Sequence, residues 1–255
     1  MIEYLFDLKR LEKKPSLTFL WAIIVNSVAI VAATQVTSIP GIDLGFFSVL
    51  FTIIPSVYFI TLLINREELM DEKAIQKGSH SLWENHGKDI MVLLFYFFGV
   101  AVSFALWAFA LPGGFDTQLE KINAIRGTGD ITQAGAFQSI LLNNFQVMIV
   151  AFIFSLVFGA GAIFIIVWNA SVLGVFIGEI SRSVWEIPLV SAGFLPHGIP
   201  EIGGYLLAGL AGGILSAAIL RRRRRILKYI LFDSLRLLTL GVLLIALGSA
   251  IEVYV

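Results

Sequence analysis

The 255-residue chain contains no cysteine and few charged residues. Without thiols it can form no disulfide and hold no thiolate nucleophile, so both are excluded. Charged residues make up 14% of the chain, whereas soluble domains average roughly 25%. The sequence also lacks a Walker-type phosphate loop, an HExxH helix and a G-x-S-x-G elbow, so nothing in it indicates ATP hydrolysis or these hydrolase chemistries.

Long apolar runs make up much of the chain. Hydrophobic residues make up 58% of the chain and the mean hydropathy is +0.89, and several runs reach the roughly 20 residues that cross a bilayer core. The runs are continuous, which disfavours a transmembrane barrel. We predict an all-α, polytopic transmembrane helical bundle with a short or broken fifth helix and a cytoplasmic N-terminus. About seven spans are expected, near residues 17–39, 45–64, 89–111, 145–168, 170–192, 199–220 and 235–253.

The uneven placement of lysine and arginine predicts the orientation, because cytoplasmic loops carry an excess of both. With the N-terminus inside, fifteen of the eighteen lysines and arginines lie on the inner side, and the C-terminus lies outside. Residues 1–14 place apolar side chains along one helical stripe, which predicts an interfacial helix on the inner leaflet. The first span is longer than a signal-peptide core and has acidic flanks, so we expect it to be retained.

The chain is expected to form a single integral membrane domain over residues 1–255. Its one sizeable outer loop, 112–142, is too short to fold as an independent domain. Within the domain we distinguish N-terminal helices (1–140), a glycine-rich core (143–220), and a polybasic loop with the last span (221–255). None of these parts implies a cofactor.

Polar side chains within the glycine-rich core are the candidate functional residues. A polar or ionisable group is costly in lipid, so it usually faces other helices or a cavity. We therefore expect these groups to meet one another inside the bundle. For the glutamate of the fifth span, the alternatives are a place at the outer interface and a pair with Arg182. The predicted polar core consists of Asn144, Asn169, Glu179, His197, Gly198 and Glu201.

Helix-end roles could also explain several of these residues. Asn144 and Asn169 stand where the fourth and fifth predicted spans begin, and asparagine is a favoured N-cap. Pro200 suits a first helical turn, where the helix dipole favours a carboxylate such as Glu201. His197 and Glu201 could pair, and such a pair can relay protons or bind a metal. Because the two make only half of a zinc site, no metal site is predicted.

Glycines recur through the fourth, fifth and sixth spans. Small residues at four-residue spacing let helix backbones approach closely in lipid. Tight packing within one subunit is the leading interpretation, and a subunit interface or a pore lining is the alternative. The predicted packing glycines are Gly159, Gly161, Gly174, Gly178, Gly204, Gly209, Gly212 and Gly213.

Five consecutive arginines follow the sixth span. Such runs usually fix topology and contact anionic headgroups. We therefore predict lipid contact and no nucleic-acid partner, with an acidic protein or a nucleic acid as the alternative. The residues are Arg221, Arg222, Arg223, Arg224 and Arg225.

Residues 143–220 resemble the stage II sporulation protein M family, chiefly through a His-Gly-x-x-Glu element followed by a glycine-rich helix. The run from Glu201 to Tyr205 is similar to that of an archaeal branch. The first 140 residues resemble the family only in hydropathy. The matching features are, in order, Asn143, Asn144, Gly159, Gly161, Asn169, Gly174 and the block PHGIPEIGGYLLAGLAGG from Pro196 to Gly213.

The resemblance implies a membrane scaffold, because the family's namesake recruits peptidoglycan-degrading partners. On that basis we expect a non-enzymatic, multi-pass protein of the cell membrane. It would act as a scaffold or assembly partner in the lipid bilayer, with other membrane proteins or with further copies of itself. The alternative is a small-solute or ion channel or transporter with a polar site around His197 and Glu201, because broken helices commonly build such sites. An intramembrane metallohydrolase is the third hypothesis.

Overall fold

A computed structural model describes residues 14–37, 39, 42–77, 82–126, 132–220 and 227–255. These residues form helices and no strands, which confirms the predicted all-α class. The helices are α2 (Ser16–Val36), α3 (Leu44–Lys77), α4 (Leu82–Ala110), α5 (Asp116–Arg126), α6 (Gln133–Phe158), α7 (Ala162–Ile180), α8 (Glu186–Leu220) and α9 (Leu227–Tyr254).

Seven of these helices are long and apolar enough to cross a membrane, so the predicted polytopic bundle is confirmed. The exception is α5, which has 11 residues and lies within the predicted outer loop. At 19 residues, α7 is the shortest of the seven, in agreement with a short fifth helix. The helical form follows from the solvent, because lipid offers no partners for backbone groups and a spanning segment must bond within itself.

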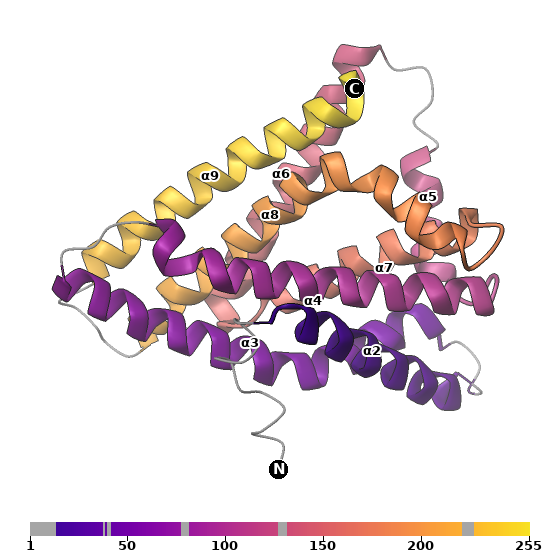
Figure 1. Cartoon of the computed structure of the whole chain (residues 1–255), viewed down its shortest axis with the longest axis horizontal. Coiled ribbons are helices and arrows are strands. Elements are labelled where there is room, and N and C mark those ends of the chain that lie inside the picture. Colours follow the sequence, from indigo (N-terminus) through magenta and orange to yellow (C-terminus); the bar gives the residue numbers. More distant parts are fainter. Residues whose placement is uncertain (1–13, 38, 40–41, 78–81, 127–131, 221–226) are drawn as a thin grey trace.

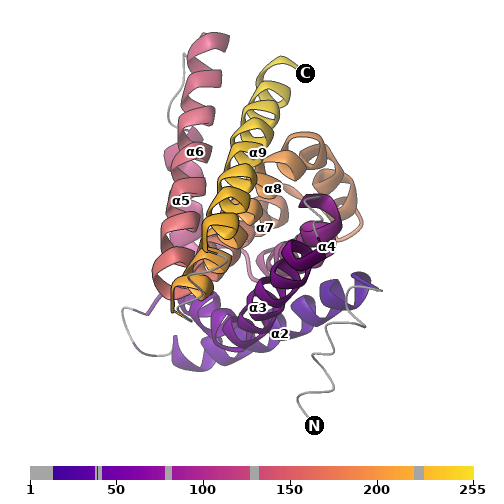
Figure 2. The same cartoon turned by 90° about the vertical axis from the view of Figure 1, so that its left-hand side faces the viewer.

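The spanning helices form two groups with α7 and α8 between them (Figure 1). In the first group, α2, α3 and α4 pack with α7 around a core that includes Ile30, Phe104 and Ile163. In the second, α6 and α9 run side by side (Figure 2), and Met148 and Ile245 connect them to α8. The helix that carries the predicted His-Gly-x-x-Glu element therefore lies between the two groups and packs against α6 and α9.

Burial sets α8 apart from the other helices. Every residue from Glu201 to Ser216 is buried, and 94% of its most apolar 18-residue window is buried, against 22% for α6 and 28% for α9. A helix that is apolar on all sides is expected to be enclosed by others. The glycine-rich part of α8 is thus covered by other helices of the same subunit.

Glycines on three faces of α8 allow this enclosure. A Cβ at Gly204 would lie 2.6 Å from Ile245 Cγ1 and 2.9 Å from the carbonyl oxygen of Gly241, both on α9. A Cβ at Gly209 would lie 2.6 Å from that of Ala162, at the start of α7. At Gly212 it would meet the backbone of α6. Gly213 is also buried within α8.

The glycines of α7 have the same relation to α4. A Cβ at Gly174 would lie 2.6 Å from Phe104 Cβ, and one at Gly178 would lie 2.8 Å from Ala108 Cβ. Gly159 and Gly161 form the turn between α6 and α7. A Cβ at Gly161 would collide with the carbonyl oxygen of Phe154 on α6, so this glycine allows a close approach, whereas nothing lies near a Cβ at Gly159. Gly159 has a φ of 68°, a conformation that favours glycine.

Two prolines lie inside α8 and explain why its start was predicted wrongly. The predicted sixth span begins at residue 199, yet the helix begins at Glu186 and runs through Pro196 and Pro200. A proline removes one backbone donor and crowds the preceding turn, which bends a helix. Figure 1 shows α8 as a bent helix. The prolines near residue 200 therefore do not mark the start of a helix. They mark the point in α8 after which every residue up to Ser216 is buried.

The boundary between α6 and α7 also differs from the prediction. α6 begins at Gln133, where the Thr132 side chain accepts a hydrogen bond from the Gly135 amide at 3.2 Å. It ends at Phe158, and α7 begins at Ala162. Asn144 and Asn169 therefore lie inside helices, and the prediction that they act as N-caps is wrong.

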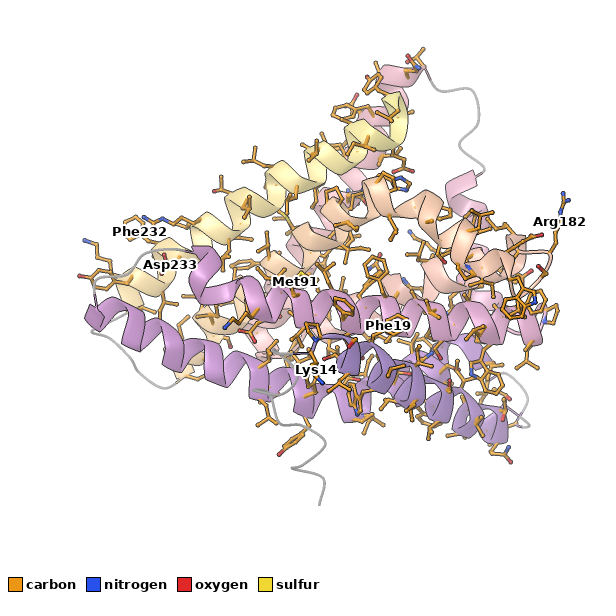
Figure 3. All side chains as sticks on the ribbon, viewed as in Figure 1. Lys14, Phe19, Met91, Arg182, Phe232 and Asp233 are labelled. Carbon is orange, nitrogen blue, oxygen red and sulfur yellow. The ribbon has the colours of Figure 1, made fainter. Side chains whose placement is uncertain are left out.

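The two ends of the bundle carry different charged residues. The α7–α8 turn carries Arg182, which projects away from the bundle, and Asp233 lies on α9 toward the opposite end (Figure 3). Asp233 forms an ion pair with Arg236 at 3.1 Å. The predicted interfacial helix, apart from Lys14, and the predicted lipid-binding arginines 221–225 lie outside the described residues.

Candidate functional site: a polar network beside a cavity

Asn144 of α6 connects to α8 through two short hydrogen bonds. Its Nδ2 donates to Glu201 Oε1 at 2.6 Å, and its Oδ1 accepts from the Tyr205 hydroxyl at 2.6 Å. Glu201 and Tyr205 are four residues apart on α8, so they share one helix face. The three side chains are buried, with 6 to 9% of each exposed. One asparagine thus satisfies two polar groups of a neighbouring helix.

Two weaker contacts complete this network. Ser249 of α9 donates to Glu201 Oε1 at 3.5 Å, and Asn143 Nδ2 donates to Asn144 Oδ1 at 3.4 Å. Three helices therefore contribute to the surroundings of a single carboxyl group. Hydrogen bonding of this kind is what permits a polar group to be buried away from water.

A glycine of α9 makes room for the carboxyl group. A Cβ at Gly248 would collide with Glu201 Cγ and would lie 2.8 Å from the carbonyl oxygen of His197. The absence of a side chain there lets α9 pass directly behind Glu201, next to Ser249. The position of the carboxyl group is thus defined from two sides, by α6 and by α9.

The network borders a cavity of about 360 Å³. The cavity has the composition of a small-molecule site, a largely apolar wall with a few convergent polar groups. The lining draws on five helices, α4 to α8. Its apolar residues are Phe97, Ile122, Val172, Leu173, Phe176, Phe194 and Ile202, and the others are Asn144, Asn169, His197, Gly198, Glu201 and Tyr205.

The structure brings together five of the six residues predicted as a polar core. His197 lies one turn before Glu201 and packs against the ring of Phe194 at 5.7 Å, nearly edge to face. Asn169 lines the cavity from α7, while its Nδ2 donates to the carbonyl oxygen of Ile165 at 2.7 Å. Gly198 contributes to the wall between them.

Glu179 lies apart from the cavity. It is exposed near the end of α7, where its Oε1 accepts from the Gly113 amide at 3.4 Å. The alternative partner proposed for it, Arg182, instead donates its backbone amide to Glu186 Oε2 at 2.9 Å. Glu179 is therefore not part of the polar core. Its exposure near a helix end agrees with the alternative of a place at the outer interface.

The helix-end explanation of Glu201 is wrong. The residue lies 15 positions after the start of α8, whereas the dipole effect falls off within the first turn. Pro200 likewise lies in the helix interior. Burial and hydrogen bonding to Asn144 and Ser249 account for the position of this carboxyl group.

Several residues of the site were not predicted. Tyr205 follows Glu201 by four residues, and that spacing could have identified it. Ser249 and the phenylalanines carry no such signal, because apolar side chains occur throughout a membrane helix. Among the described residues, no group of three or more His, Asp or Glu side chains has the arrangement of a metal site.

Two polar contacts between helices α2, α3 and α4 are fully buried. Thr52 of α3 donates to Asn26 of α2 at 2.7 Å, and the Tyr96 hydroxyl of α4 donates to Ser56 of α3 at 2.7 Å. All four residues are fully buried, and none lines the cavity. Such bonds hold membrane helices together. They differ from the network around Glu201 in that none of their residues borders the cavity.

Comparison with known proteins shows that the network lies within a region that matches a protein family. Residues 92–255 match the family model described as Stage II sporulation protein M, and all residues that line the cavity fall within this range. The chain is also 31% identical over 124 residues to "Uncharacterized protein MJ0793" of Methanocaldococcus jannaschii. That alignment covers 47% of the present chain and 70% of the archaeal protein. No solved structure matches the chain.

Proposed function

Because this chain belongs to the stage II sporulation protein M family and is a multi-pass membrane protein, we propose that its cavity binds a small solute. The proposed role is that of a non-enzymatic channel or transporter of the cell membrane. The observation that carries this proposal is the position of Glu201, Asn144 and Tyr205 on the wall of a 360 Å³ cavity. An ionisable group at membrane depth usually marks a substrate or ion pathway.

The bend of α8 supports the same role. Interrupted helices in transporters place polar groups at membrane depth where they face a substrate. Pro196 and Pro200 lie immediately before the buried carboxyl group of Glu201, and His197 and Gly198 between them line the cavity. The bend of α8 thus lies next to the proposed site.

Thiol labelling tests whether the cavity is wet. The natural chain has no cysteine, so a single introduced thiol is the only reactive one. Val172 lines the cavity, whereas Val175 on the same helix is fully buried and does not. In lipid nanodiscs, V172C is expected to react with a charged methanethiosulfonate reagent, and V175C is not. Equal protection of the two thiols would rule out a hydrated solute site.

A scaffold role is a second proposal, supported by the family resemblance and by the outer face of α9. Phe232, Leu235, Leu243 and Leu247 are each at least 50% exposed and, together with the exposed Arg236, lie on a face that lipid or a partner helix could cover. The glycines of α8 from Gly203 to Gly213 do not offer such a surface, because they are buried within the subunit.

Size-exclusion chromatography with light scattering tests the scaffold proposal. Protein extracted in mild detergent is expected to elute as an oligomer or together with a second membrane protein. Material that is entirely monomeric and free of partners would leave solute binding as the sole remaining proposal.

A further inference from the structure

The cavity is lined by an acidic side chain, Glu201, and by no lysine or arginine. Among the described residues, none forms an ion pair with Glu201. His197 is the one basic side chain in the lining. An anion would therefore find no fixed positive charge there.

One oxygen of the Glu201 carboxyl group is left available. Both hydrogen bonds that it receives from described residues, from Asn144 and Ser249, go to Oε1. No described residue donates to Oε2, and this atom is not among the sealed, unpartnered polar atoms of the described residues. The network thus fixes the side chain through one oxygen and leaves the other to a ligand in the cavity.

Aromatic rings form much of the remaining wall. Phe176 and Phe194 pack edge to face with ring centroids 5.3 Å apart, and Phe97 and Tyr205 also line the cavity. The faces of such rings attract cations, most strongly where water is excluded. The aliphatic part of the wall, which includes Val172 and Leu173, suits a hydrocarbon body.

From the single carboxyl group, the absent basic residues and the aromatic wall, we infer that the cavity binds an organic cation. The ligand is an ammonium group attached to a small apolar body, with its charge between Glu201 Oε2 and the phenylalanine rings and its body along the aliphatic part of the wall. This inference rests on the proposed solute-binding function and specifies the class of solute.

Three probes of similar size separate charge from shape. Isothermal titration of the full chain in nanodiscs would use benzyltrimethylammonium, benzenesulfonate and benzyl alcohol. Benzyltrimethylammonium is expected to bind saturably and at least tenfold more tightly than either of the others. Binding of the sulfonate or the alcohol with equal or greater affinity would overturn the cation inference and still support a solute site.

Matched substitutions locate the cation. E201Q keeps the shape and hydrogen-bonding capacity of the side chain and is expected to weaken benzyltrimethylammonium binding at least tenfold. E179Q removes the same charge from an exposed acid outside the cavity and is expected to leave the affinity unchanged. Equal affinities of E201Q and the natural chain would overturn the inference.

A second variant keeps the test valid if E201Q does not fold. F194L retains an apolar side chain and removes one ring, and it is expected to weaken the cation about threefold without changing the affinity for benzyl alcohol. Equal weakening of both probes would show that the ring acts through shape alone and would overturn the aromatic part of the inference. If no probe binds and V172C stays unreactive, the solute-binding function itself fails.

Discussion

Replacing Gly212 with leucine is expected to abolish packing of α8 against α6. A Cβ at this position would collide with the carbonyl oxygen of Phe152 and would lie 2.9 Å from Ser155 Cβ and 3.0 Å from the amide nitrogen of Leu156. These are mainly backbone atoms, which cannot turn aside as a flexible side chain can. Because α6 carries Asn144, separation of the two helices would also dismantle the polar network.

The expected loss exceeds about 3 kcal/mol, at the upper end of what overpacking a core produces. Unfolding in mixed micelles, followed by circular dichroism, would measure it. The control is G193L on the same helix, since nothing lies within 4 Å of a Cβ at Gly193. G193L is expected to unfold within about 0.5 kcal/mol of the natural chain. A G212L variant as stable as G193L would contradict close packing of α6 and α8 at Gly212.

Replacing Asn144 with alanine is expected to destabilise the bundle by about 2 to 3 kcal/mol. The change removes the donor to Glu201 and the acceptor for Tyr205 at once. Interhelical hydrogen bonds in membranes are worth only about 0.6 kcal/mol on average. The larger figure arises because truncation leaves a buried carboxyl group with one contact of 3.5 Å and a buried hydroxyl without its acceptor.

The adjacent Asn143 provides the control for this variant. It is exposed, and its contact with Asn144 is long at 3.4 Å. N143A is therefore expected to change the free energy of unfolding by less than about 0.5 kcal/mol. Equal losses from N143A and N144A would mean that the network makes no specific contribution to stability.

The fold was largely predictable because lipid restricts the choices. Continuous apolar runs of about twenty residues have to be helices, so their number and approximate positions follow from hydropathy alone. The starts of α6 and α7 were misplaced, and the error in the start of α8 occurred at Pro196 and Pro200. Proline inside a soluble helix costs roughly 3 kcal/mol, which argues for a helix start, whereas neighbouring helices in a membrane bundle can compensate the freed backbone groups.

Part of the polar site was predictable, whereas Tyr205, Ser249 and the pairing of the side chains were not. The cost of polar groups in lipid identified Asn144, His197 and Glu201 before the structure was known. Asn144 and Glu201 are 57 residues apart, and no local pattern indicates that they meet. Their contact depends on how α6 and α8 pack. Glu179 shows the converse, because a polar residue near a helix end can be solvated and needs no partner.

A double-mutant cycle between Asn144 and Glu201 tests most directly whether these side chains form one unit at the cavity. The free energy of unfolding would be measured for the natural chain, N144A, E201A and the double variant. We predict that the double variant loses at least about 1 kcal/mol less than the sum of the two single losses, as for residues in direct contact. Losses that add to within about 0.3 kcal/mol would show two independent side chains and would contradict the network on which the site is built.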